Sequence, residues 1–337
     1  MTRFGDFIQI MATERCNLRC THCAVPEEDS PAARELTTSE WFEFIDRAAV
    51  EGVRSLTLSG GEVTLRHDAV DLLRRACEAG IARVTLLTNG LLSERVINEL
   101  VELQSDEAAL GIHVSLDGAG PSTHDVIRGA GSFAATMRRI ARFREVGGAV
   151  TGLHTVIHRG NLHELDDLVS LIRELGCSVW TVFPVASLGR AVGSDLVPLT
   201  PEEWVEVTVA LHRLRADGLD VGQMGPIVED EWPSSLGTVP RGRETTSPNI
   251  VVGPDGEMFT CPPLRAHPIG TVGTVPEERF WVDVVARGEE LTRKACPTCK
   301  FRLLCTGIDG EDPFRQGAIE HAHPQDLLSS VGSDRGL

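Results

Sequence analysis

Tyrosine is absent from the 337-residue chain, and no run of apolar residues approaches the roughly 18–20 that a membrane-spanning helix needs. No phenol can therefore act as an acid, a base or a radical carrier. Basic residues are also scarce, because 32 Lys and Arg stand against 49 Asp and Glu, and the formal charge of −17 disfavours nucleic acid and anionic lipid as partners. The first residues, MTRFGDFIQI, lack the build of a secretion signal, so we expect a cytoplasmic protein without a membrane partner.

The number of cysteines is nine, and an odd number does not suit a framework in which every cysteine forms a disulfide. Seven of them fall into two groups, which indicates metal binding in a reducing compartment. The first group is Cys16, Cys20 and Cys23, and the second is Cys261, Cys296, Cys299 and Cys305. The remaining two, Cys77 and Cys177, lie singly in apolar periodic segments and are expected to be ordinary buried thiols.

Short β-branched runs alternate with amphipathic patterns from residue 6 to about residue 184. The expected strands are 7–13, 54–59, 83–88, 111–116, 152–157 and 178–183. The expected helices between them are 41–50, 69–80, 95–103, 132–148 and 163–176. Consecutive β–α units predict a parallel sheet with right-handed crossovers. Six units are too few for a closed eight-stranded barrel. We therefore predict an α/β fold built on a partial (β/α)6 barrel.

The pattern changes after residue 190. Thr200 and Pro201 begin a helix over 200–217, as its N-cap and its first helical residue. The segment IVVGPDGEMFTCPP, 250–263, predicts a β-hairpin with a Pro-Asp-Gly turn. The expected division is therefore a barrel over 1–190, a helical and irregular linker over 191–249, an α+β domain over 250–310 and a polar tail over 311–337.

Polar or glycine-rich motifs follow the first four expected strands: CNLRCTHC at 16–23, SGGE at 59–62, TNG at 88–90 and SLDG at 115–118. Because the carboxyl ends of parallel strands meet at one rim, we expect a single site assembled from several loops. The three thiols can face one metal centre from one loop. A structural zinc ion would need a fourth ligand nearby, whereas three ligands on a [4Fe–4S] cluster leave one iron open.

The Cys-x3-Cys-x2-Cys spacing after a first strand, with Gly-Gly-Glu after the second, resembles the radical S-adenosylmethionine (SAM) superfamily over most of residues 7–190. The resemblance implies a [4Fe–4S] cluster on Cys16, Cys20 and Cys23, with SAM chelated by the open iron. It also implies reductive cleavage of SAM to a 5′-deoxyadenosyl radical that abstracts hydrogen from the substrate. The electron would come from a donor such as flavodoxin or ferredoxin.

The resemblance also implies contacts to SAM from the rim motifs. Arg128 would pair with the SAM carboxylate, with a surface salt bridge as the alternative. His22 stands where the family often has an aromatic residue against adenine, and Val63 stands where a proline is common. The full set of implied contacts is His22, Gly60, Gly61, Glu62, Thr88, Asn89, Ser115, Asp117 and Arg128.

The second cysteine group resembles the SPASM/twitch extension of radical SAM enzymes. The full SPASM pattern has further cysteines that this chain lacks, so the resemblance implies a twitch-like α+β domain with one auxiliary [4Fe–4S] cluster. A zinc ion on the four thiolates is the alternative. A fully ligated cluster suits electron transfer rather than substrate binding.

Two enzyme classes and one other class remain open. The first is an oxidoreductase or lyase of antibiotic biosynthesis that oxidises, dehydrates or decarboxylates a small sugar, cyclitol or nucleoside. The alternative is a peptide maturase that forms thioether or carbon–carbon crosslinks. An electron carrier or regulator would leave the glycine-rich motifs without a purpose. His154 and Arg190 are the candidate catalytic residues, with Arg190 suited to a carboxylate, and His158 and Trp180 could also face the barrel interior.

Overall fold

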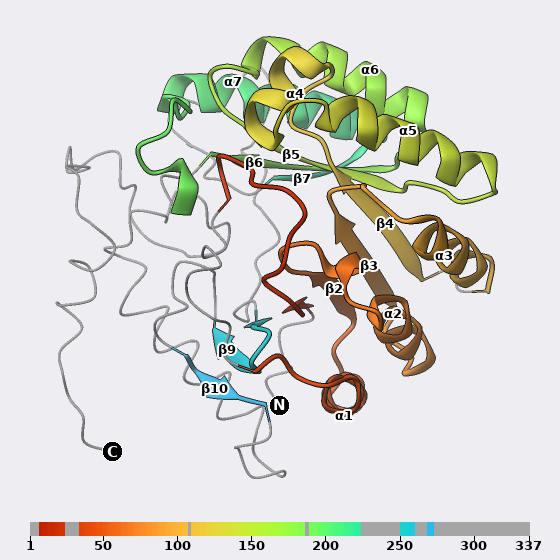
Figure 1. The fold of residues 1–337 in the computed structure, drawn as a ribbon. Helices are drawn as coiled ribbons and strands as arrows, with labels where there is room; N and C mark the ends of the chain where they lie inside the picture. Colours follow the sequence, from red (N-terminus) through yellow and green to blue (C-terminus); the bar gives the residue numbers. More distant parts are fainter. Residues whose placement is uncertain are drawn as a thin grey trace, which may run out of the picture.

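The computed structural model describes residues 7–23, 34–106, 109–185, 189–223, 250–259 and 268–272. These residues form one sheet with helices along its outer side (Figure 1). The strands are β1 (Phe7–Met11), β2 (Ser55–Ser59), β3 (Arg83–Thr88), β4 (Leu110–Ser115), β5 (Gly152–Ile157), β6 (Val179–Pro184), β7 (Asp220–Gln223), β8 (Ile250–Val252), β9 (Glu257–Phe259) and β10 (Gly270–Thr271). The helices are α1 (Thr38–Val50), α2 (Ala69–Glu78), α3 (Glu94–Asp106), α4 (Pro121–Arg128), α5 (Ser132–Glu145), α6 (Leu165–Leu175) and α7 (Pro201–Ala216).

The strand order is β10-β9-β8-β1-β2-β3-β4-β5-β6-β7, and β1 to β8 pair in parallel throughout. This confirms the expected α/β fold with its parallel sheet. The helix α4 and the strands β7 and β10 were not predicted. The helix α4 is a short polar segment that begins with Pro121, and β7 has only four residues.

The two faces of the sheet differ in composition because side chains alternate along each strand. The outer face packs fully buried apolar residues beneath the helices, such as Ile10, Leu58 and Leu86. The inner face of β1 to β6 carries mostly small or polar side chains, which are Gln9, Ser55, Thr57, Ser59, Thr85, His113, Ser115, His154 and Thr181. The sheet therefore has an apolar face beneath the helices and a largely polar inner face.

Helix boundaries follow local capping. Thr37 and Glu40 form a capping box at the start of α1, and α6 ends at Gly176 with φ +71°, as expected for a C-cap. Thr200 accepts a hydrogen bond from the backbone nitrogen of Glu203, which confirms its predicted role as an N-cap. Among the described residues, no helix has both the length and the apolar character that a membrane span requires.

The predicted hairpin is present as β8 and β9, with Gly256 in the turn at φ +87°. Its first strand pairs in parallel with β1, so the hairpin extends the barrel sheet. The rest of the expected 250–310 domain, apart from 268–272, lies outside the described residues, as do Cys261, Cys296, Cys299, Cys305 and the tail. The domain boundaries and the auxiliary cluster stay predictions.

Candidate active site

Two glycines let the loop after β2 lie directly on the chain that leads to the cysteine loop. The backbone nitrogen of Gly61 donates to the carbonyl oxygen of Thr13 at 2.8 Å. A Cβ atom on Gly60 would lie within 3.0 Å of the Thr13 carbonyl oxygen, and one on Gly61 would lie that close to the carbonyl oxygens of Glu14 and Arg15. No larger residue fits without displacing the cysteine loop.

The cysteine loop is held by backbone hydrogen bonds from two directions. Within the loop, the nitrogen of Cys23 donates to the carbonyl oxygen of Cys20 at 3.2 Å, and the nitrogen of Leu18 donates to Cys16 Sγ at 3.4 Å. From outside, Arg190 donates its backbone nitrogen to Cys23 O at 3.0 Å and its Nε to Cys20 O at 2.9 Å. Arg190 is therefore bonded to the cysteine loop.

The donor chemistry of this loop fits an iron–sulfur cluster. Burial raises the pKa of the Cys20 thiol to about 11 and also raises that of Cys16, so these thiols are protonated until a metal centre displaces their protons. Within the described ranges, no three such side chains converge on the position of a single ion. A cluster does not need that convergence, since each of its cysteines binds a separate iron.

Glu62 joins the loops that follow β2 and β3. Its buried carboxylate accepts hydrogen bonds from Thr64 Oγ1 at 2.6 Å, from Thr88 Oγ1 at 2.9 Å and from the Asn89 nitrogen at 2.7 Å. The Asn89 side chain in turn donates to Asn17 Oδ1 at 2.7 Å, beside the first cysteine. Three of the four rim motifs that the sequence predicted to converge therefore meet in one network.

Asp117 and Arg128 form a buried ion pair at 2.6 Å beside the cysteine loop. Asp117 is fully buried and also accepts from the nitrogen of Val156 at 2.8 Å. Burial by itself would raise the pKa of Asp117, but the Arg128 guanidinium, the His22 ring and the hydrogen bond from the Val156 nitrogen together outweigh it and hold that pKa at about 2. Arg128 Nη1 lies 3.9 Å from Cys20 Sγ, so its charge also faces the cysteine loop. The alternative of a surface salt bridge for Arg128 does not apply.

Three histidines near Asp117 have a buried ring nitrogen with no hydrogen-bond partner among the described residues, namely His22 Nδ1, His124 Nε2 and His158 Nε2. Burial lowers the pKa of His22 to about 4, so the ring is neutral at pH 7. A buried polar atom without a partner costs roughly 1–3 kcal/mol, which a polar group of a bound ligand would recover. These orphaned nitrogens therefore fit a cofactor at this rim.

Other predicted residues lie elsewhere on the sheet. Ser115 and His154 are register partners on the inner face. Trp180 is fully buried on the outer face and donates to Thr155 Oγ1 at 2.9 Å, so the expectation that it could face the interior is wrong. Cys77 and Cys177 are buried, as predicted.

Three contributors to the site were not predicted from the sequence. His113 lies two residues before Ser115, and this spacing alone places it on the inner face. Arg66 is buried and donates to the carbonyl oxygen of Ala12 at 3.2 Å and to Glu35 Oε2 at 3.0 Å, which braces the end of β1. Asn17 offers no signal beyond its position between two cysteines.

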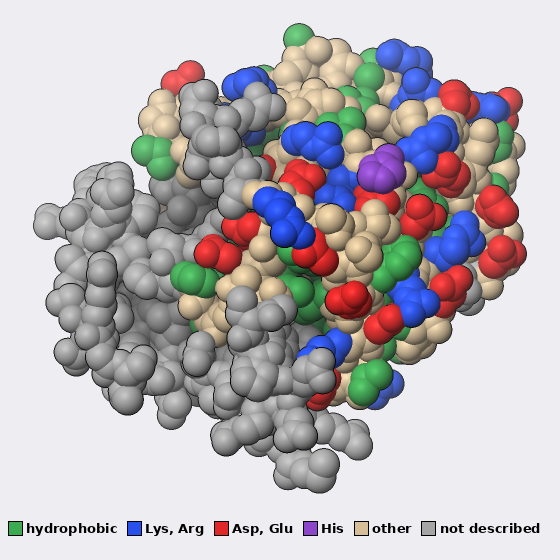
Figure 2. Space-filling model, turned by 60° about the horizontal axis from the view of Figure 1, so that its bottom comes forward, with side chains coloured by type: hydrophobic (Ala, Val, Ile, Leu, Met, Phe, Trp, Pro, Cys, Tyr) green, Lys and Arg blue, Asp and Glu red, His purple; other side chains and the backbone are tan. Residues whose placement is uncertain are grey.

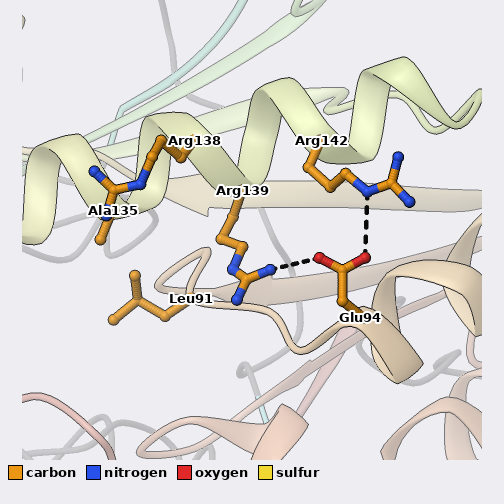
Figure 3. Close-up of a pocket in the computed structure, with 6 residues that line it drawn as sticks. All are labelled: Leu91, Glu94, Ala135, Arg138, Arg139 and Arg142. Carbon is orange, nitrogen blue, oxygen red and sulfur yellow. Dashed lines mark hydrogen bonds and ion pairs between the residues drawn. The ribbon is translucent and has the colours of Figure 1, made fainter.

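A surface groove between α3 and α5 lies apart from these residues (Figure 3). Arg139 and Arg142 both reach Glu94 across it, at 2.7 and 3.2 Å, while Arg138 points away from that carboxylate. Acidic and basic side chains are also interspersed over the described surface in Figure 2. We assign the groove no part in the site.

Residues 10–172 match the Radical SAM superfamily. The chain is 37% identical over 334 residues to an AdoMet-dependent heme synthase of Methanosarcina barkeri, covering 91% of this chain and 92% of that protein. It is 39% identical over 302 residues to a PqqA peptide cyclase of Ruegeria pomeroyi, covering 85% and 77%. The fold is similar to that of Streptococcus suis SuiB bound to S-adenosylmethionine, with a TM-score of 0.65 and 16% identity over 91% and 73% of the two chains.

The chain thus belongs to the radical SAM superfamily and is a radical SAM enzyme. Membership implies a [4Fe–4S] cluster and SAM as cofactors, which together supply a 5′-deoxyadenosyl radical for hydrogen abstraction.

Proposed function

We propose that this enzyme is a peptide maturase, which abstracts hydrogen from a precursor peptide and joins two of its residues by a thioether or carbon–carbon bond. The observation that carries the proposal is the 39% identity to a PqqA peptide cyclase, because it spans 85% of the chain and so extends beyond the part that matches the superfamily. The relatives favour this alternative over a small sugar, cyclitol or nucleoside substrate.

The inner face of the sheet supports a peptide substrate. A peptide presents a donor and an acceptor at almost every residue, and these groups need partners once they are removed from water. The inner face supplies hydroxyl and imidazole groups at alternate positions of neighbouring strands, including Thr57, Thr85, Ser115 and Thr181. An apolar interior would not compensate the desolvation of a peptide backbone.

The cofactor assignments form part of the proposal. Cys16, Cys20 and Cys23 hold the SAM-binding cluster, and a reduced flavodoxin or ferredoxin supplies its electron. The four late cysteines hold one auxiliary [4Fe–4S] cluster. The residues around SAM are His22, Gly60, Gly61, Glu62, Thr88, Asn89, Ser115, Asp117 and Arg128. Of these, Glu62 and Asp117 act by orienting the rim loops, because their carboxylates are already engaged by donors of the protein.

A heme-forming reaction is the second candidate, since the similarity to an AdoMet-dependent heme synthase spans nearly the whole of both chains. An assay that offers the enzyme both kinds of substrate distinguishes heme formation from peptide crosslinking.

The test begins with the anaerobically reconstituted enzyme, SAM and dithionite, with 5′-deoxyadenosine and methionine measured by mass spectrometry. Peptides encoded by short reading frames beside the gene are then added, and in parallel an iron-containing tetrapyrrole and a panel of sugar nucleotides. We expect one peptide to lose two hydrogen atoms per crosslink. Deuterium placed on its side chains should appear in 5′-deoxyadenosine. Conversion of the tetrapyrrole or a sugar nucleotide, with every peptide unchanged, would contradict the proposal.

A further inference from the structure

His113 on β4 and His154 on β5 lie side by side on the inner face of the sheet. His113 Nδ1 and His154 Nε2 are 3.2 Å apart, which is a hydrogen-bond distance, and the ring centroids are 5.3 Å apart. Gly152 is the register partner of His113. A Cβ atom on Gly152 would lie 2.7 Å from the His113 ring, so this glycine makes room for the pair.

The pair is neutral at pH 7. Burial lowers the pKa of His113 to about 4 and that of His154 to about 3, and the His113 ring further opposes protonation of His154. The charged groups that act on the pair are Asp220 on His113, and Asp117 and Arg128 on His154. Two neutral imidazoles at this distance share one proton, so one outer nitrogen carries a hydrogen and the other is free to accept one.

Few other groups on the described inner face can accept a proton. Among the inward positions of β1 to β6, the titratable side chains are His113, His154 and Arg83, and an arginine cannot act as a base at neutral pH. The carboxylates of Glu62 and Asp117 at the rim are occupied by internal donors. Apart from the rim histidines His22, His124 and His158, the imidazole pair therefore provides the bases on the described inner face.

We propose that His154 and His113 form a proton relay, which accepts the proton that the peptide loses as its crosslink closes and passes it to solvent beside Asp220. This inference rests on the proposed peptide function. Asp220 begins β7 at the same register level as His113 and is exposed, so it marks the solvent side of the relay.

The reaction balances as follows in a thioether closure. The bound cofactors would supply the 5′-deoxyadenosyl radical that takes one hydrogen atom from a peptide carbon, and an oxidised iron–sulfur centre would take one electron from that carbon. The resulting carbocation bonds to a cysteine sulfur that still carries its proton. The sulfur becomes acidic while the carbon–sulfur bond forms, so a base of lowered pKa can take its proton in the bond-forming step. His154 Nδ1 receives it, the hydrogen on His154 Nε2 moves to His113 Nδ1, and the hydrogen on His113 Nε2 leaves to water.

A measurement without substrate tests the geometry. In holoenzyme with 15N-labelled histidine, we expect both rings to stay neutral between about pH 8 and 5, because their pKa values lie below the ordinary value of about 6.5. His113→Gln should change the tautomer populations of the His154 ring. Independent titration of both rings near the ordinary value would overturn the relay whatever the substrate is.

The reaction itself is tested with His113→Gln and His154→Gln, and with His163→Gln as a control at an exposed position. We expect crosslinking to fall about 100-fold in the first two variants, within the range for loss of a general base. Deuterium transfer from the peptide to 5′-deoxyadenosine and iron content should be unchanged, and added imidazole should restore part of the crosslinking of His154→Ala. Equal crosslinking in all variants would overturn the relay but would leave the proposed peptide function intact. A wild-type enzyme that modifies no peptide overturns the proposed function and, with it, the relay.

Discussion

The Nε of Arg190 donates a hydrogen bond to the backbone carbonyl oxygen of Cys20 across 2.9 Å. The two residues are 170 positions apart, and a second hydrogen bond, from the Arg190 nitrogen to Cys23 O, runs beside the first. The segment after β6 is thus fastened to the cysteine loop at two points. The Arg190 side chain, which the sequence predicts to suit a substrate carboxylate, instead fixes the backbone of the proposed cluster ligands.

Removing this contact should loosen the cysteine loop without unfolding the barrel. We expect Arg190→Met to lose about 0.5–1.5 kcal/mol of stability, the usual net value of one hydrogen bond. The protein should keep its iron but show a changed electron paramagnetic resonance spectrum when SAM is added to the reduced enzyme. Arg190→Lys keeps the charge but lacks the planar fork of donors, and should resemble Arg190→Met. A wild-type spectrum in the lysine variant would show that charge matters rather than geometry.

Gly61→Ala should prevent assembly of the site. The added methyl group would lie within 3.0 Å of two backbone carbonyl oxygens of the chain before Cys16, and backbone atoms cannot rotate away. We expect the barrel to fold, as judged by circular dichroism. The iron content should fall by about four irons per chain, which is the content of one cluster. Gly120→Ala is the matched control, because its φ is −150° and its Cβ would meet no atom closer than 3.9 Å. Full iron content in Gly61→Ala would contradict the close approach.

Asp117→Asn leaves the Arg128 charge buried without its partner. Loss of one member of a buried pair typically costs about 3–5 kcal/mol, so we expect a large drop in unfolding free energy at pH 7. The folded pKa of Asp117, about 2, is below its ordinary 3.8, so the ionised carboxylate stabilises the wild type above about pH 3.8. This contribution is lost as the pH falls through about 2.

The penalty of Asp117→Asn should therefore shrink as the pH falls below about 4 in urea unfolding of the metal-free protein. The double variant Asp117→Asn/Arg128→Met should be less destabilised than the sum of the two single variants, since it buries no lone charge. If the destabilisation by Asp117→Asn did not depend on pH, the Asp117 side chain would contribute through its packing and not through its charge.

The sequence predicted the repeating part of the fold because its signal is periodic. Six β-branched runs became β1 to β6 within one to two residues of their expected bounds. The helix α4 has eight residues with a proline at its start, and β7 includes a glycine, so neither carries a clear period. The face of the sheet on which a given side chain lies was harder to predict, because a shift of one residue in register moves the side chain to the opposite face. Trp180 and His154 illustrate this, since one lies beneath the helices and the other lies inside the barrel.

The rim motifs were located correctly because the ends of parallel strands must meet. Their internal partners were not predicted. Glu35 meets Arg66 from a segment without regular structure, and Asn17 meets Asn89 across two loops. Such pairs depend on loop conformation, which leaves no periodic trace in the sequence.

Iron and sulfide content after anaerobic reconstitution separates the two cysteine groups. We expect about eight irons per chain, since each proposed cluster holds four, and about four in the triple variant Cys16→Ala/Cys20→Ala/Cys23→Ala. The complementary variant, Cys296→Ala/Cys299→Ala/Cys305→Ala, should also keep about four irons and still cleave SAM in the absence of substrate. It should fail to complete a crosslink, because an electron from the substrate would lack an acceptor. A wild-type value of about four irons that falls to none in the first variant would assign zinc or no metal to the late cysteines. The electron removed from the substrate would then have to return to the first cluster.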